Sequence, residues 1–198
     1  MSISQLNPAD LNSFKQFIFS IQPISDEAWN AFQSHWEVIN LKRKMLITRS
    51  GETERYIYFV LAGVQHAFYV TEEGKEVSIV FTYPYSFSGV ADSFLTQTPS
   101  LYSCETLSSS KLLRCEYNTF MELVEKFPEI KTLLLKSLSR VLKGALERQI
   151  ELQCFNAEQK FSTLLKRSPQ VFQLIPHKYL ASYLGMDAAT FSKLLSKY

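Results

Sequence analysis

The chain has 198 residues, of which 46% are hydrophobic and 20% charged, and this ordinary composition excludes a disordered or collagen-like protein. Its length allows one or two domains. The longest uncharged apolar stretch, Val77 to Val90, is interrupted by Pro84, and the N-terminus lacks a basic-then-apolar signal pattern, so we expect a cytoplasmic protein without a membrane segment.

The N-terminal part of the chain has a helical pattern. Ser25 is suited to cap the N-terminus of a helix, and Asp26 follows in the first turn, where the helix dipole favours an anion. Apolar aromatic residues then recur at helical spacing, at Trp29, Phe32 and Trp36. We therefore predict a helix that precedes the next, strand-like part of the chain.

From Ile39 the pattern changes to short runs of β-branched and aromatic residues. These runs lie at 39–47, 55–63, 64–83 and 109–117. The third contains Glu73 and Gly74, a turn signal between two apolar runs, and so predicts a hairpin. Several short strands separated by turns predict a small antiparallel barrel or jelly roll.

A long helix is predicted to follow, beginning near Pro128 and continuing from Glu129 to about Gln153. Its apolar residues recur at three- and four-residue steps and form a stripe that is wider than a strict two-stranded seam. We expect one side of this helix to lie on its own barrel and the other to pair with the same helix of a second subunit. The alternative is a helix buried within one chain. The residues expected in the dimer interface are Leu134, Leu138, Val141, Leu142 and Ala145.

The closing stretch "IPHKYLASYLGMDAATFSKLLSKY" predicts two short helices hinged at Gly185. Leu180 and Leu184 are four residues apart on the first helix, so they lie on one face. Gly185 can adopt the positive φ that ends that helix, and Asp187 is a good N-cap for the second. A generic helical hairpin without DNA remains the alternative.

Charge is divided unevenly along the chain. Residues 1–154 carry 15 Lys and Arg against 17 Asp and Glu, a net charge of −2, whereas residues 155–198 carry 6 against 2, a net charge of +4. A basic C-terminal module is typical of a segment that contacts nucleic acid, because cations displace the counterions of phosphates. A soluble basic face without a partner is the alternative.

No enzymatic signature is present. The sequence has no glycine-rich phosphate loop, no Gly-x-Ser-x-Gly and no His-Glu-x-x-His. The three cysteines form no close pair, and neither they nor the three histidines have metal-ligand spacing. We therefore expect no catalytic residues, no metal and no cofactor.

Two stretches carry a resemblance to a known family. In "GETERYIYFVLAGVQHAFYVTEEGKEVSI", glycines stand where a β-roll turns sharply, at Gly51, Gly63 and Gly74. In the closing stretch, apolar, small and turn residues match helix-turn-helix positions, at Leu180, Ala181, Leu184, Gly185, Met186, Phe191 and Leu194. With the order of the parts, these stretches resemble the cyclic-AMP receptor protein and FNR (Crp/Fnr) family of transcription regulators over essentially the whole chain.

The resemblance implies an α+β fold in three parts. An antiparallel β-roll of the jelly-roll, cyclic-nucleotide-binding-like kind, with its N-terminal helix, is expected at residues 1–125. A long dimerisation helix is expected at 126–154, and a C-terminal (winged-)helix-turn-helix that binds DNA at 155–198. Because the printed sequence ends at Tyr198, we expect nothing after the recognition helix.

The resemblance also implies which residues contact DNA, and the expected set is Lys178, Ala188, Ala189, Thr190, Ser192, Lys193 and Lys197. The chain departs from the family at Ala188 and Ala189, where the family usually presents an arginine and a glutamate. At Lys193 the family typically has an arginine, which can grip guanine with two hydrogen bonds, whereas lysine offers one point charge. Base discrimination by polar contacts is therefore expected to be modest, and alanine methyl groups favour a T-rich site.

The effector pocket departs from the family more strongly. Cyclic-nucleotide-binding members hold the ribose with a Gly-Glu pair and the phosphate with an Arg-Ser or Arg-Thr pair. Here Gly89 is followed by Val90, the arginine position falls near Ser100, and no Lys or Arg occurs between Lys75 and Lys111. A buried phosphate without a cation would be poorly compensated for its lost water, so cyclic-nucleotide binding is not expected. The pocket candidates are Phe87, Gly89, Val90, Ser100, Leu101 and Tyr102.

An FNR-like iron–sulfur cluster is not expected either, because it requires four thiolates and the chain has three dispersed cysteines. The aromatic residues of the sensor could line a pocket for an apolar ligand or form the barrel core; they are Phe81, Tyr83, Tyr85, Phe87, Phe94 and Tyr102.

The sequence thus predicts a homodimeric regulator that binds double-stranded DNA and that responds to an unidentified effector or to none. Two alternatives stay open: a degenerate sensor module that acts through a protein partner without DNA, and a protein that binds a small molecule, or acts on one, in its β-roll. The sequence does not identify the effector, the DNA site, the regulated genes, or whether the protein activates or represses.

Overall fold

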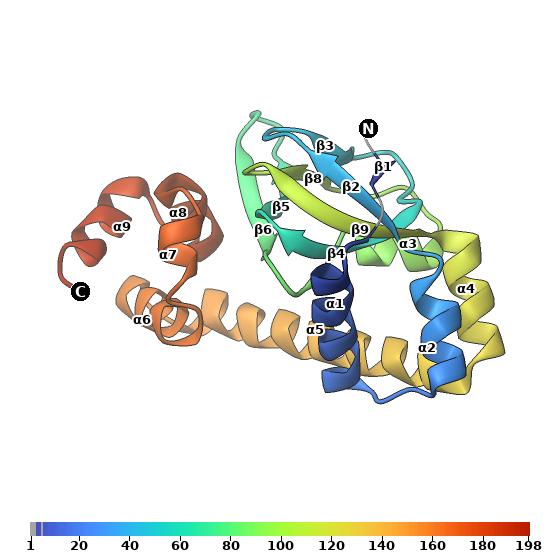
Figure 1. Cartoon of the computed structure of the whole chain (residues 1–198). Helices are drawn as coiled ribbons and strands as arrows, with labels where there is room; N and C mark the ends of the chain where they lie inside the picture. Colours follow the sequence, from blue (N-terminus) through green and yellow to red (C-terminus); the bar gives the residue numbers. More distant parts are fainter. Residues whose placement is uncertain (1–2, 5) are drawn as a thin grey trace. The chain divides into compact units, whose positions relative to one another are not determined.

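The computed structural model describes residues 3–4 and 6–198 and divides the chain into two compact units. The first consists of Met1–Ala67 and Phe81–Arg140, and the second of Phe68–Val80 and Val141–Tyr198. One long helix, α5 (Pro128–Cys154), contributes residues to both units. The predicted α+β class is confirmed (Figure 1).

The first unit combines a β-roll with helices that flank it (Figure 1). Its helices are α1 (Pro8–Ile21), α2 (Asp26–Gln33), α3 (Ala91–Thr96), α4 (Tyr117–Lys126) and the first half of α5. The strands of the roll are β1 (Ile3–Ser4), β2 (Glu37–Leu41), β3 (Leu46–Thr48), β4 (Tyr56–Ala62), β5 (Gln65–Val70), β6 (Glu76–Thr82), β7 (Phe87–Ser88), β8 (Ser103–Thr106) and β9 (Ser110–Glu116). The second half of β5 and most of β6 belong to the second unit.

The strands form two sheets, in the orders β1-β2-β9-β4-β7 and β3-β8-β5-β6. The pairs β1–β2, β2–β9, β9–β4, β4–β7 and β3–β8 are antiparallel. The turn between β5 and β6 closes with a hydrogen bond of 2.9 Å from the amide of Gly74 to the carbonyl of Thr71. Gly74 has a φ of +77°, as a tight hairpin turn requires, so the predicted hairpin is confirmed.

The main core of this unit lies between the first sheet and its helices. Large side chains from both are almost fully buried there, including Phe14, Ile18, Phe32, Phe59, Leu113, Ile130 and Leu133. The ring of Phe14 lies 4.7 Å from that of Phe59, which joins α1 to β4. Close packing of this kind fixes the helices on the sheet and leaves the other face of the strands to the interior of the roll.

Local sequence signals account for several helix boundaries. The Ser25 hydroxyl accepts a hydrogen bond from the amide of Ala28 and caps α2, as predicted, and α5 begins at Pro128, as predicted. No helix was predicted between the strand that ends near Tyr117 and the long helix at Pro128, where α4 (Tyr117–Lys126) lies. Glu116 ends β9 and at the same time accepts hydrogen bonds from the amides of Asn118 and Thr119, which starts α4.

The second unit includes four helices that gather near the C-terminal end of α5 (Figure 1). They are α6 (Ala157–Arg167), α7 (Val171–Leu174), α8 (His177–Leu184) and α9 (Ala188–Leu195). Asn156 and Gln159 form a reciprocal capping box that starts α6 two residues after α5 ends. The chain therefore changes direction at 155–156 without leaving the first amides of α6 unsatisfied.

Candidate nucleic-acid interface

The helix-turn-helix is built from α8, a sharp turn at Gly185, and α9. Gly185 has a φ of +64°, and its amide donates to the carbonyl of Ser182 at 3.0 Å. The amide of Met186 donates to the carbonyl of Ala181 at 3.1 Å, which completes a Schellman motif. The glycine ends α8 as the sequence predicted.

Asp187 starts the second helix. Its Oδ1 accepts a hydrogen bond of 2.8 Å from the amide of Thr190, and its Oδ2 accepts one of 2.7 Å from the Thr190 hydroxyl. The amide of Thr190, and then its hydroxyl, lower the pKa of Asp187 below its ordinary value because both stabilise the carboxylate. Asp187 is therefore an N-cap, and the hydroxyl of Thr190 is engaged within the helix.

A small core holds the two helices together. Phe191 of α9 is 1% exposed, and its ring lies 5.4 Å from Phe161 of α6 and 5.4 Å from His177 of α8. Other buried members of this core are Leu164, Val171, Ile175, Tyr179, Leu180, Ala181 and Leu184. One face of α9 is thus fixed inward, and the opposite face is presented to solvent.

The exposed side of α9 carries most of the predicted DNA-contacting residues. Ala188, Ala189, Ser192 and Lys193 are all exposed, and we call them the reading face. Ala188 and Ser192 are four residues apart, as are Ala189 and Lys193, so the four side chains lie together on one side of the helix. Thr190 is half-buried and lies at the edge of this face.

The other two predicted contacts have partners within the module. Lys197 Nζ lies 2.5 Å from Glu158 Oε1, and the Tyr198 hydroxyl donates to the same oxygen at 3.3 Å. Through this pair, Lys197 lowers the pKa of Glu158, and Glu158 raises the pKa of Lys197. Lys178 is exposed, with its ammonium 4.6 Å from the centre of the Tyr179 ring.

The predicted dimer residues lie on a part of α5 that is open to solvent. Val141 and Leu142 are each 61% exposed, Ala145 is exposed, and Leu134 and Leu138 are half-buried. Further apolar side chains extend this row and are exposed, namely Leu135, Leu146 and Ile150. A helix in water does not ordinarily present so many large apolar groups on one side.

The pocket candidates differ widely in their exposure to solvent. Leu101 is 78% exposed, whereas Val90 and Ser100 are buried. Phe87 and Tyr102 are half-buried, and Gly89 has a φ of +100°. A Cβ at Gly89 would lie 2.9 Å from the Tyr58 ring, so the backbone here passes close to the roll interior.

Aromatic residues of the sensor do not form a single wall. Phe87 and Phe94 pack in the core between the first sheet and the helices, and Tyr85 is 56% exposed.

A buried acid that the sequence analysis missed lies beside this segment. Glu54 is 2% exposed, and its Oε2 accepts hydrogen bonds from the Thr48 hydroxyl and, at 3.4 Å, from the amide of Val90. The same oxygen would lie 3.3 Å from a Cβ at Gly89. A buried carboxyl group thus lies beside Gly89 and Val90, two of the predicted pocket residues.

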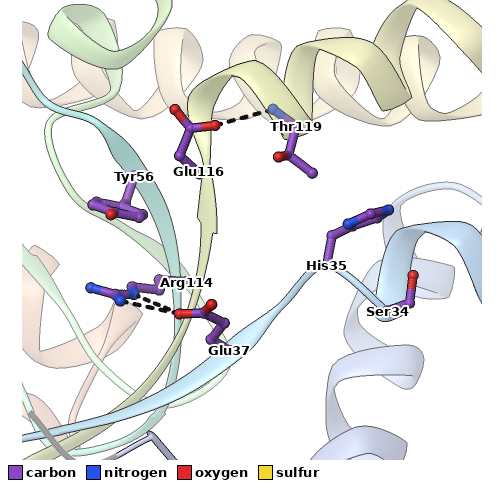
Figure 2. Close-up of a pocket in the computed structure, with 7 residues that line it drawn as sticks. All are labelled: Ser34, His35, Glu37, Tyr56, Arg114, Glu116 and Thr119. Carbon is purple, nitrogen blue, oxygen red and sulfur yellow. Dashed lines mark hydrogen bonds and ion pairs between the residues drawn. The ribbon is translucent and has the colours of Figure 1, made fainter.

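The cleft in Figure 2 has a volume of about 380 Å³ and lies in the first unit. Its lining residues are Ser34, His35, Glu37, Tyr56, Arg114, Glu116 and Thr119. Arg114 donates from Nε and Nη2 to Glu37 Oε2 at 3.2 and 3.1 Å, and its guanidinium lies 4.5 Å from the centre of the Tyr56 ring. Glu116 is engaged as the cap of α4. Since these charged groups already have partners, we assign the cleft a structural role.

The cysteines do not fit an iron–sulfur cluster. Burial raises the pKa of Cys104 and of Cys115 to about 12, so both are thiols rather than the thiolates that iron requires. Across residues 3–4 and 6–198, no group of three His, Cys, Asp or Glu side chains is arranged to hold a metal ion. In the same residues, no helix is long and apolar enough to cross a membrane.

Comparison with known proteins agrees with this architecture. Residues 38–127 match the cyclic nucleotide-binding domain family. The fumarate and nitrate reduction regulatory protein of Vibrio cholerae is 24% identical over 161 residues, which cover 76% of this chain and 64% of that protein, less than two thirds of its length. Regulatory protein HlyX of Actinobacillus pleuropneumoniae is 22% identical over 169 residues, which cover 80% of this chain and 70% of that protein.

Among solved structures, FixK2 from Bradyrhizobium japonicum has the same fold, with a TM-score of 0.72 at 15% identity, covering 81% of this chain and 82% of that one. The chain is therefore a relative of the Crp/Fnr family of transcription regulators, and residues 38–127 form a domain of the cyclic nucleotide-binding domain family.

Proposed function

We propose that the chain is a homodimeric transcription regulator, not an enzyme, that binds double-stranded DNA through α8 and α9. The observation that carries the proposal is the reading face of α9, which is exposed while the rest of that helix is capped and packed. A helix held in this way by a second helix is the arrangement that enters the major groove in helix-turn-helix proteins. The relatives' names describe regulatory proteins, which supports the same conclusion.

Dimerisation is supported by the row of exposed apolar side chains on α5. Charged residues, Arg140, Lys143 and Glu147, occupy the opposite side of the same helix. A two-fold contact along the apolar row would cover these side chains and would place two reading faces about 34 Å apart, one turn of the DNA helix.

The sensor unit is proposed to respond to an effector other than a cyclic nucleotide, or to none. No Lys or Arg occurs at residues 76–110, and the buried Glu54 carboxylate lies beside Gly89 and Val90. A cyclic phosphate in the roll would therefore meet a buried carboxyl group nearby and no cation from residues 76–110.

The test is a selection from random duplexes with the parent chain and with an Ala188→Arg, Ala189→Glu variant. We expect the parent to enrich a two-fold symmetric site. The variant should enrich different bases at an unchanged separation of half-sites, because only the reading face has changed. Identical sequences from both proteins, or no enrichment from either, would overturn the proposal in favour of a module that acts through a protein partner.

A further inference from the structure

An ionic cluster around the buried carboxylate of Glu151 joins three helices of the second unit. Glu151, near the C-terminal end of α5, is 4% exposed. Its Oε2 accepts a hydrogen bond of 2.8 Å from Arg148 Nη1 on the same helix, and its Oε1 accepts one of 2.5 Å from Arg167 Nη1 at the end of α6. The Arg148 side chain is 11% exposed. The carboxylate is therefore held between two guanidinium groups from two helices.

Arg148 extends the cluster to the first helix of the helix-turn-helix. Its Nη2 donates to the backbone carbonyl of Tyr183, and its guanidinium lies 4.1 Å from the centre of the Tyr183 ring. Tyr183 stands in the last turn of α8, where carbonyls lack partners within the helix and where a cation is favoured by the dipole. The amides of Gly185 and Met186 donate to the carbonyls of Ser182 and Ala181 in the Schellman motif. Arg148 donates to a third carbonyl of the same turn, that of Tyr183.

The geometry of this cluster determines the orientation of the joined helices relative to one another. An apolar contact tolerates sliding and rotation, whereas a planar guanidinium that binds a carboxylate, a carbonyl and an aromatic face does so in one arrangement. A buried ion pair contributes little net stability compared with apolar side chains of similar size, and its best-attested role is to select one arrangement among several.

We propose that Arg148, oriented by Glu151, is a positioning residue that fixes α8, and with it the reading face of α9, at one angle to the C-terminal part of α5. This inference rests on the proposed function, because the angle would set the separation at which two reading faces meet DNA. Arg167 closes the cluster from α6 and holds the second oxygen of the Glu151 carboxylate in place.

The first experiment measures the angle without DNA. Spin labels at Gln149→Cys and Ser196→Cys, with exposed Cys154 replaced by Ser, report the distance between α5 and the end of α9 by pulsed electron resonance. We compare the parent with Arg148→Lys, which keeps the charge but loses the fork and most of the stacking, and with Glu151→Gln. The control is Glu147→Gln, which breaks an exposed pair with Lys143 one turn away on the same helix.

We expect one narrow distance distribution for the parent and for Glu147→Gln, and a distribution at least about twofold wider for Arg148→Lys and Glu151→Gln. Helix content by circular dichroism should be unchanged in Arg148→Lys, which separates loss of orientation from loss of folding. Distributions as narrow as the parent's in both cluster variants would overturn the proposal.

The second experiment is the random-duplex selection, repeated with Arg148→Lys. The expected result is the same half-site sequence with several separations in place of one. A single unchanged separation would overturn the positioning role even if the distance distribution widens. Failure of the parent itself to enrich any duplex would count against the proposed DNA-binding function, whereas the spin-label result would still decide whether the cluster fixes the helices.

Discussion

Glu54 is an acidic residue whose side chain is buried away from solvent. Its Oε1 accepts hydrogen bonds from the amides of Arg55 and Tyr56, at 3.0 and 3.1 Å, and its Oε2 accepts from the Thr48 hydroxyl. Burial raises the pKa of this carboxyl above its ordinary value, and the hydrogen bonds, that of Thr48 foremost, oppose the rise without cancelling it. The group is therefore more easily ionised in the unfolded chain than in the folded one.

This difference predicts a pH dependence of stability. Because the folded state holds the proton more tightly, ionisation of Glu54 costs stability as pH rises above the unfolded pKa of about 4.3. We expect the free energy of unfolding of the parent to fall relative to Glu54→Gln as pH rises from the unfolded pKa to the higher folded pKa, by about 1.4 kcal/mol for each unit by which the two pKa values differ. Urea unfolding at several pH values measures it, with the exposed Glu52→Gln as control. Parallel pH profiles of parent and Glu54→Gln would contradict the assignment.

Lys193 and Lys197 are close in sequence but differ in their surroundings. Lys193 is on the reading face and has no ion-pair partner in the described part of the chain, whereas Lys197 is paired with Glu158. We expect Lys193→Ala to reduce the slope of log K against log salt concentration by about 0.9, the contribution of one phosphate, and Lys197→Ala to leave that slope nearly unchanged. Equilibrium titrations of one duplex at several salt concentrations measure both. Equal losses of slope would show that Lys197 leaves Glu158 for a phosphate.

The helices and strands of this protein differ in how well the local sequence predicts them. Signals that act within a few residues were sufficient: Gly74 for the hairpin, Pro128 for the start of α5, and Gly185 with Asp187 for the turn between α8 and α9. Each depends on a local backbone angle or on a hydrogen bond to a neighbour three residues away. That is why these boundaries could be predicted, whereas α3, α4, α6 and α7 were not predicted as separate helices.

Pairings between distant residues could not be predicted in the same way. Glu54 meets Val90 across 36 positions, and Lys197 meets Glu158 across 39. Nothing in the surrounding letters distinguishes the buried Glu54 from the exposed Glu52, because burial is decided by the packing of the roll. The charge split identified the basic module, but only the structure shows which lysines in it already have partners.

The apolar row on α5 gives a prediction about assembly. Leu138 and Leu142 lie near its centre, and replacing both with lysine would place two charges in the proposed seam. The parent is expected to sediment as a dimer at tens of micromolar, and the double variant should dissociate at least about a hundredfold more readily, about 2.8 kcal/mol. Glu147→Lys is the control, because it also changes the net charge by +2 but on the opposite side of the helix.

Sedimentation equilibrium, with circular dichroism to confirm that the variants are folded, makes the comparison. A monomeric parent in that concentration range would remove the support for a dimer. Equal dissociation of Glu147→Lys and the leucine variant would attribute the effect to net charge and not to the apolar row.

In the molecule as a whole, a domain of the cyclic nucleotide-binding domain family is joined to a basic helix-turn-helix, and residues 76–110 of this domain contain no Lys or Arg. The amide of Ser100, at the position where an arginine would be needed, donates to the carbonyl of Glu52, and its hydroxyl donates to the carbonyl of Tyr102. Both groups of this residue are therefore used inside the roll.

We therefore expect the 198-residue chain to give no saturable heat when it is titrated calorimetrically with cyclic AMP or cyclic GMP, and its affinity for a selected duplex to be unchanged by either nucleotide. A Kd at or below about ten micromolar, about 7 kcal/mol of binding free energy, would contradict the prediction. The same titration with Glu54→Gln is a second test, because this variant removes the buried carboxyl group and adds no cation. We expect this variant to give no saturable heat either, because a desolvated phosphate would still lack a positively charged partner. Binding by Glu54→Gln but not by the parent would show that repulsion by the buried carboxylate, and not the absence of a cation, is what excludes the nucleotide.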